Sequence, residues 1–521
     1  MAPAHRARTE SVRGNLVESP PRVTSRLRSS CRMTPINIGA GVIRGKDGKR
    51  AHPNPADRVW PPVAPDHRPN VCPARPGVTH QRCVAWPGKN RVNWFEACPG
   101  SPKRYPHWPR VPKADTEFLV SGRSAHNHQP DAGVISMNDS EKRHLRHALV
   151  RANIAIRAGR PLYPEYNNVF LRTYPVTFGA PRSEYQMYQF WFRTRGCTYD
   201  RAGQCSMCNY GIGPEIRPEV VAHSVERKLA TVPEAACLYL SPSGSLLDDR
   251  EVPVEMRDRL LRAAAARHPS TFAFESRPEV CDRDKLDRLR RHFAAGTRLV
   301  CQIGVESWDP QVRSMCHLKP TRQQAYLDTA GTLLDLGFDP IANITLGGLG
   351  LSPREAYLDT LAGVRGARAA GYRTQMVFPL SAKAGTLLGW AHDQGLWDPP
   401  TLWMLVRLLA ECADDATDSD GYGDLDISWY NPELDDVVQS RPDSCERCRP
   451  VLVESLSAFR LRPRADALAP ATAWDSCPCP DRTDRLLTDP DPLDYLDRLV
   501  AVADRWAGQG DLSDRHGLGV G

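Results

Sequence analysis

The sequence predicts an α/β protein built on a mainly parallel sheet of six strands. Two observations indicate this fold class. Short apolar runs typical of buried strands alternate with longer segments of helical periodicity, and the alternation continues from about residue 185 to about 400. Strands that alternate with helices form βαβ units, whose strands run parallel. Six such strands make an open sheet or a partial barrel, and in both the functional residues gather at the carboxyl ends of the strands.

Each expected element rests on its local pattern. The six strands are rich in aliphatic and aromatic residues and cover 186–194, 236–241, 271–275, 298–305, 340–346 and 374–380. Between them, apolar residues recur with helical spacing over 254–268, 282–293, 321–336 and 353–370. Two further helices are expected after the alternation stops, over 402–412 and 491–506.

The chain is expected to divide into four parts. Residues 1–136 hold 19 of the 46 prolines and lack periodicity, so we expect a disordered extension. Its alternatives are a basic arm for nucleic acid, or a stretch that is not native coding sequence, because Met137 precedes a capped helix start at Asn138. A helical lead-in over 137–184, a core over 185–400 and a C-terminal helical region over 401–521 follow.

Charge is distributed unevenly along the chain. Residues 1–136 hold 22 Lys and Arg against 9 Asp and Glu, whereas residues 137–521 hold 46 against 52. The body of the protein therefore shows no global electrostatic footprint for nucleic acid. The sequence has no secretory signal and no apolar run of the roughly 18 residues that a membrane helix needs, so we expect a cytoplasmic protein that does not bind membranes.

Three of the sixteen cysteines lie on one short loop directly after the first expected strand. Cys197, Cys205 and Cys208 have the spacing C-x7-C-x2-C. Three thiolates hold three irons of a cubane cluster and leave the fourth iron open to a small molecule. The alternatives are unligated cysteines, or zinc, which needs a fourth ligand that no nearby Cys or His supplies.

This loop, together with the βα units that follow it, resembles the radical SAM superfamily. Its long first gap, with Met207 at the hydrophobic position, is similar to the branch that holds the Elongator catalytic subunit and the radical subunit of archaeosine synthase. The resemblance to the archaeosine synthase subunit extends over about 190–365 and rests on four blocks, RTRGC at 193–197, SGSLLD at 243–248, ESRPE at 275–279 and IGVES at 303–307.

The resemblance implies a [4Fe–4S] cluster on Cys197, Cys205 and Cys208 that binds S-adenosylmethionine (SAM) and cleaves it reductively, giving a 5′-deoxyadenosyl radical that abstracts hydrogen from a substrate. It also implies a flavodoxin- or ferredoxin-type electron donor. The residues expected to contact the cofactor stand at strand ends or on the loop: Met207, Ser243, Gly244, Ser245, Glu275, Arg277 and Glu306. For the last three, the alternative is a structural ion pair at the rim of the barrel.

A second cysteine group lies near the C-terminus. Cys445 and Cys448 form one close pair, and Cys477 and Cys479 form another. Four thiols in two pairs suit a structural zinc site, with an auxiliary iron–sulfur cluster or no metal as alternatives.

The favoured function is a radical SAM enzyme that acts on a small molecule or nucleoside, because an acidic body is poorly suited to phosphates. The alternatives are a tRNA-modifying radical SAM enzyme and, from another class, a non-catalytic iron–sulfur or zinc protein that binds nucleic acid. The last alternative leaves the blocks at 243–248 and 275–279 unexplained. No catalytic residue is identified from the sequence.

Overall fold

The computed structural model describes residues 137–158, 169–178, 183–213, 215–415, 424–427 and 438–513. The expected extension over 1–136 lies outside these residues. Within them, the strands are β1 (Phe170–Phe178), β2 (Ser183–Phe192), β3 (Cys237–Pro242), β4 (Thr271–Ser276), β5 (Arg298–Glu306), β6 (Phe338–Leu346), β7 (Thr374–Pro379), β8 (Ala382–Lys383), β9 (Asp424–Ile427) and β10 (Val438–Ser440).

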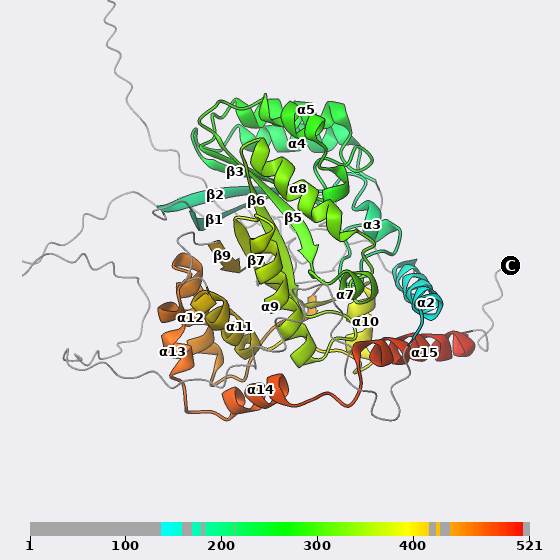
Figure 1. The fold of residues 1–521 in the computed structure, drawn as a ribbon. Coiled ribbons are helices and arrows are strands. Elements are labelled where there is room, and N and C mark those ends of the chain that lie inside the picture. Colours follow the sequence, from blue (N-terminus) through cyan, green and yellow to red (C-terminus); the bar gives the residue numbers. More distant parts are fainter. Residues whose placement is uncertain are drawn as a thin grey trace, which may run out of the picture. The chain divides into compact units, whose positions relative to one another are not determined.

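Helices lie before, between and after these strands (Figure 1). The first eight are α2 (Asp139–Ala158), α3 (Thr198–Arg201), α4 (Pro218–Leu229), α5 (Val254–Ala265), α6 (Arg283–Arg290), α7 (Pro310–Met315), α8 (Gln323–Asp335) and α9 (Pro353–Ala369). The others are α10 (Leu387–Asp393), α11 (Leu402–Asp415), α12 (Arg449–Leu461), α13 (Ala469–Thr472), α14 (Cys479–Thr488) and α15 (Tyr495–Ser513), with short 3-10 turns at Pro278–Val280 and Ala465–Leu468. None of these helices is long and apolar enough to cross a membrane.

The main sheet confirms the predicted α/β class. Its strand order is β1-β2-β3-β4-β5-β6-β7-β9, and the six strands from β2 to β7 all run parallel, as expected. Strand β1 pairs antiparallel with β2, and β9 pairs parallel with β7; neither was predicted. Since β1 and β9 stand at opposite ends of this order, the described sheet is an open, partial barrel.

The two faces of the sheet differ in chemistry. One face is covered by helices and carries fully buried side chains such as Phe190, Leu240 and Phe274. The paired positions of the other face include Glu275 beside Gln302, and Asn343 beside Met376. Parallel strands buried on both faces are normally apolar throughout, so these polar side chains make the inner face a candidate surface for binding a ligand.

The lead-in segment contains more than the expected helix. The predicted cap is present, because Asn138 Oδ1 accepts hydrogen bonds from the backbone N–H groups of Ser140 (2.9 Å) and Glu141 (3.1 Å), and Glu141 Oε2 accepts one from Asn138 N–H (2.7 Å). This reciprocal pair is a capping box that starts α2. Strand β1 then follows, so the helical expectation over 137–184 holds only for its first part.

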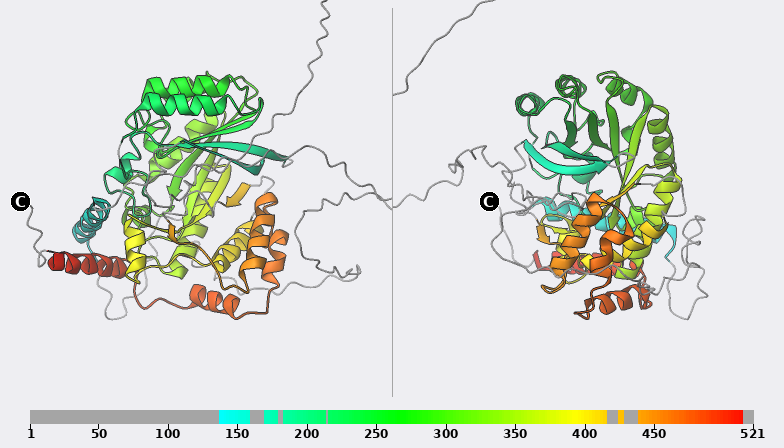
Figure 2. Two further views of the ribbon diagram at one scale, coloured as in Figure 1. Left: turned by 180° about the vertical axis from the view of Figure 1, so that it is seen from behind. Right: turned by 90° about the vertical axis from the view of Figure 1, so that its left-hand side faces the viewer.

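The C-terminal region packs its helices around α11 and against α2. Arg407 of α11 forms a bidentate ion pair with Asp484 of α14, at 2.7 and 2.8 Å. Helix α15 lies beside α2, as both figures of the fold show (Figures 1 and 2). The last helix therefore contacts the helix whose side chains also bond the cysteine loop.

Candidate metal and cofactor site

The cysteine loop leaves the carboxyl end of β2 and is held from behind by two side chains of α2. Arg157 Nη2 donates to the carbonyl oxygens of Cys205 (2.9 Å) and Cys208 (3.1 Å), and the same guanidinium pairs with Asp200. Asn153, fully buried, donates to the carbonyls of Gly203 (2.9 Å) and Cys205 (2.8 Å). These bonds fix the backbone and leave the thiols free to bind a ligand.

The three thiols are spaced differently from those of a single-ion site. Among the described residues, the group whose possible ligand atoms all lie within 4.8 Å of one another is the C-terminal one, not Cys197, Cys205 and Cys208. Cys205 and Cys208 are close enough for a hydrogen bond. A set of three thiols, with no fourth ligand in a compact group among the described residues, suits a cluster with one open iron better than a closed zinc site.

Charges around the loop act on the thiols in opposite directions. Burial and the Glu251 carboxylate raise the pKa of Cys197 to about 12, although the Arg277 guanidinium, with Nη1 3.7 Å from Sγ, opposes them. Burial also raises the pKa of Cys205, but a hydrogen bond with Cys208 and the nearby Lys319 and Arg157 cations together lower it to about 6. These cations would partly balance the negative charge of a thiolate-bound cluster.

Arg277 lies in a buried ion-pair network that includes Glu251, a residue that sequence reasoning did not identify. Its Nη1 donates to Glu251 Oε1 at 2.6 Å and its other terminal nitrogen pairs with Asp248. Glu251 Oε1 also accepts from Thr198 N–H (2.6 Å), and Oε2 accepts from Ser245 N–H. The network thus ties Cys197's neighbour Thr198 to the ends of β3 and β4, as the ion-pair alternative for Arg277 expects.

The Ser243-Gly244-Ser245 turn passes very close to the cysteine loop. Gly244 has φ +141°, and a Cβ there would lie 3.2 Å from the Cys197 Cα and collide with the Glu251 carboxylate. Only glycine permits this approach. Ser245 Oγ lies 2.8 Å from Ser276 Oγ, whereas the buried Ser243 Oγ has no hydrogen-bond partner among the described residues. An orphaned hydroxyl at this position is suited to a ligand that the structure does not contain.

Glu306 stands in a strained conformation on a β-bulge at the end of β5. Its φ is +59°, uncommon for a residue other than glycine, and the bulge lies between Gly304 and Glu306. Oε1 pairs with the Lys319 ammonium, while the buried Oε2 has no partner among the described residues. Strain of this kind is typical of functional sites. Lys319 is mostly buried, with 12% of its side chain exposed, and its positive charge acts on Cys205 and Cys208.

Glu275 and Met207, the remaining predicted residues, have different surroundings, and His317 lies next to the loop. Glu275 lies on the inner face and accepts hydrogen bonds from Ser241 Oγ (2.9 Å) and the Tyr239 hydroxyl; burial raises its pKa. Met207 is 7% exposed and packs in the main apolar core. His317, also buried, has an Nδ1 without a described partner, and burial together with Lys319 lowers its pKa to about 3. The imidazole is therefore neutral at working pH.

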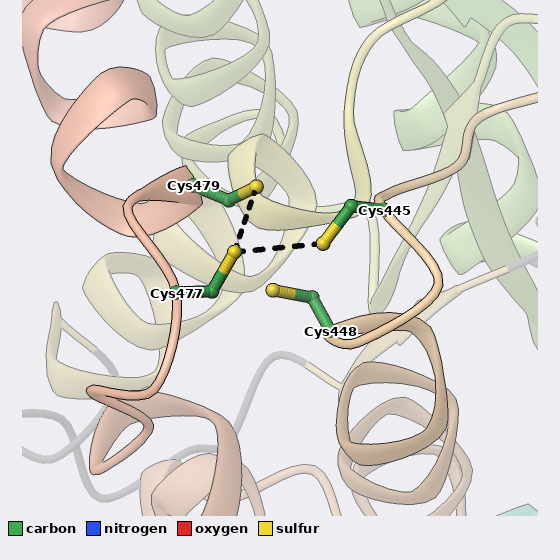
Figure 3. A group of neighbouring side chains, drawn as sticks. All are labelled: Cys445, Cys448, Cys477 and Cys479. Atoms are coloured by element: carbon green, nitrogen blue, oxygen red, sulfur yellow. Dashed lines mark hydrogen bonds between the residues drawn. The ribbon is translucent and has the colours of Figure 1, made fainter.

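The four C-terminal cysteines converge, far along the chain from the first loop (Figure 3). Their Sγ atoms all lie within 4.8 Å of one another. Cys477 Sγ is 3.5 Å from Cys445 Sγ and 3.4 Å from Cys479 Sγ.

Comparisons with known proteins agree with the resemblance drawn from the loop. No protein-family profile matches the chain. It is 24% identical over 231 residues to the uncharacterized protein MJ0550 of Methanocaldococcus jannaschii, covering 42% of this chain and 62% of that protein. It is 24% identical over 308 residues to archaeosine synthase subunit beta of Methanosarcina acetivorans, covering 57% of this chain and 83% of the relative. The chain thus spans about three fifths of the first relative's length, and the predicted resemblance to the archaeosine synthase subunit is confirmed.

Two solved structures show weaker likeness. The archaeal Elp3 of Methanocaldococcus infernus with an N-terminal deletion gives a TM-score of 0.35 at 13% identity, over 47% of this chain and 60% of that one. Queuine lyase from Clostridium spiroforme, bound to SAM and queuine, gives 0.33 at 14% identity, over 52% of this chain and 99% of that one. Likeness at this level is too low to assign a function.

Proposed function

We propose that this protein is a radical SAM enzyme whose [4Fe–4S] cluster is bound by Cys197, Cys205 and Cys208. The observation that carries the proposal is a rigid three-thiol loop at the carboxyl edge of a partial barrel, with Lys319 and Arg277 beside it. Three protein ligands would leave one iron open for the amino and carboxylate groups of SAM.

When bound, the cluster and SAM supply reductive cleavage of the sulfonium and hydrogen abstraction from a substrate. The protein's own residues position the ligands. Because Gly244 has no side chain, the turn at 243–245 can pass close to Cys197. The Ser243 hydroxyl and Glu306 Oε2, which have no partner among the described residues, are available to form hydrogen bonds with SAM. Arg277, already paired with Asp248 and Glu251, holds the loop and is poorly placed to release its partners for the cofactor.

The inner face favours a small polar substrate. The guanidinium groups of Arg460 and Arg172 lie 5.5 and 5.9 Å from the centre of the Tyr174 ring. The Glu275 carboxylate, which accepts from Tyr239, lies on the same face, so groups of both charges line it. A small molecule or nucleoside with both hydrogen-bond donors and acceptors suits such a surface. The acidic composition of residues 137–521 also favours such a substrate. We propose such a substrate and an electron donor of the flavodoxin or ferredoxin type.

A second candidate is modification of a nucleoside within tRNA. It is favoured by the similarity to archaeosine synthase subunit beta over 83% of that relative. Binding assays with tRNA over a salt series would separate the two candidates, because contacts to phosphates make the affinity fall steeply with salt.

The proposed activity is tested by anaerobic reconstitution of the full chain with iron and sulfide. Addition of SAM and dithionite should then yield 5′-deoxyadenosine. A protein that gains about four irons per chain yet forms no 5′-deoxyadenosine with or without candidate substrates would contradict the proposal.

A further inference from the structure

We propose that Cys445, Cys448, Cys477 and Cys479 bind a single structural zinc ion that joins helices α12 and α14 over α11. This site is separate from the loop at Cys197 and does not depend on the function proposed for it. Its geometry, its position at two helix starts and an orphaned indole N–H beside it support the proposal.

The spacing of the sulfur atoms fits one ion. With Zn–S bonds of about 2.3 Å, the edge of a tetrahedron of sulfurs measures about 3.8 Å. Two Sγ–Sγ separations of 3.4 and 3.5 Å lie just below that value, and no two of the four sulfur atoms are more than 4.8 Å apart. An iron–sulfur cubane would need its thiolates spread wider, so the geometry favours a single ion over an auxiliary cluster.

The four thiols point toward one another from two segments that each start a helix (Figure 3). Cys448 directly precedes α12, and its N–H donates to the Cys445 carbonyl at 3.0 Å, which makes a tight turn between the two ligands. Cys479 is the first residue of α14, with Cys477 two positions before it. The positive ends of both helix dipoles therefore face the place where thiolate charge would gather.

A donor without a partner lies beside the site. Trp403 of α11 is 1% exposed, and its Nε1–H has no hydrogen-bond partner among the described residues. The indole N–H approaches the Cys448 thiol without reaching full hydrogen-bond geometry. A metal-bound thiolate accepts hydrogen bonds far better than a neutral thiol, so deprotonation of Cys448 by zinc would satisfy this buried donor.

The test measures zinc and iron in the full chain purified without oxygen. We expect about one zinc per chain, with four sulfur neighbours at about 2.3 Å by zinc-edge X-ray absorption. Cys477→Ser should lower zinc retained after chelation at least tenfold and leave iron in the first site unchanged. Cys237 is a buried cysteine on β3 whose Sγ lies 3.5 Å from Ser270 Oγ. Cys237→Ser is therefore the matched control, and this variant should keep zinc at the C-terminal site.

Several results would overturn the proposal. One is a folded wild-type protein that contains no zinc and whose four thiols react with iodoacetamide. The others are iron at this site in place of zinc, and nitrogen ligands in the zinc-edge absorption spectrum. If Cys477→Ser fails to fold, the wild-type absorption and alkylation measurements still decide the question. Because 5′-deoxyadenosine formation is not part of this test, failure of the zinc site and failure of the proposed function remain distinguishable.

Discussion

Replacing Glu251 with Gln should destabilise the protein and loosen the cysteine loop. The carboxylate accepts hydrogen bonds from Thr198 N–H (2.6 Å), Thr198 Oγ1 (2.7 Å) and Arg277 Nη1 (2.6 Å) through one oxygen, and from Ser245 N–H through the other. An amide keeps one acceptor oxygen, and its NH2 group must then face an N–H donor. Thr198 begins α3 directly after Cys197, so the disturbance reaches the loop.

The expected cost can be worked from these contacts. One buried N–H left without an acceptor costs roughly 1–3 kcal/mol. Removing one charged partner of a buried ion pair costs about 3–5 kcal/mol when the other charge is left without any partner. Arg277 keeps its ion pair with Asp248, so the lower end of this range applies. We therefore expect the free energy of unfolding to fall by about 3–4 kcal/mol.

Urea denaturation of the metal-free protein measures this loss, and the iron content after reconstitution reports on the loop. Glu226→Gln is the matched control, because Glu226 pairs with Arg259 where both side chains are partly exposed, at 28% and 39%. That surface pair should contribute less than about 1 kcal/mol. If Glu251→Gln lost no more stability than Glu226→Gln and bound as much iron as the wild type, the network would not hold the loop.

Three further predictions concern other parts of the structure. Asp359 is buried and accepts a hydrogen bond from Ser307 Oγ (2.7 Å), and burial raises its pKa from 3.8 to about 7. The native state then holds more protons than the unfolded state, so wild-type stability is lost as pH rises from about 4 to 7. Asp359→Asn should remove that loss, so its free energy of unfolding should exceed that of the wild type by at most about 4 kcal/mol at pH 8 and by little at pH 4. Urea melts at the two pH values measure this, and an equal gain at both would refute the raised pKa of Asp359. Asn153→Ala should cost about 2–4 kcal/mol and lower iron retention, because the Gly203 and Cys205 carbonyls and the Leu387 N–H each lose a hydrogen bond, although Arg157 still donates to Cys205. The surface change Gln324→Ala should do neither. A chain beginning at Met137 should fold and keep SAM cleavage, because the capping box at Asn138 starts α2; insolubility on expression would count against this.

The parallel core was predictable because its strands are continuous apolar runs separated by helical periodicity. Strand β1 escaped prediction because Pro175 interrupts it, and proline is unusual inside a strand except at an edge, which is where β1 lies. Strand β9 escaped because Asp424–Ile427 is four residues long and half acidic.

The candidate site was predictable where the cysteine spacing or one of the four blocks marks its residues, as at Cys197, Gly244 and Arg277. The cysteine spacing identified the loop, but Asn153 and Arg157 reach it from about 50 positions earlier, and Glu251 from 53 positions later. Nothing in the stretch around Glu251 distinguishes it from its acidic neighbours Asp248 and Asp249. Side chains that support a site through tertiary contacts leave no local pattern, so the structure was needed to find them.

The central claim is tested most directly by iron content and SAM cleavage in single Ala variants of Cys197, Cys205 and Cys208. Cys237→Ala, which removes a buried thiol on the adjacent strand β3, is the control. Each loop variant should lose most of its reconstituted iron and form no 5′-deoxyadenosine with dithionite and SAM, while the control keeps both. Full iron content and cofactor cleavage in all three loop variants would show that the cluster ligands lie elsewhere and would contradict the account.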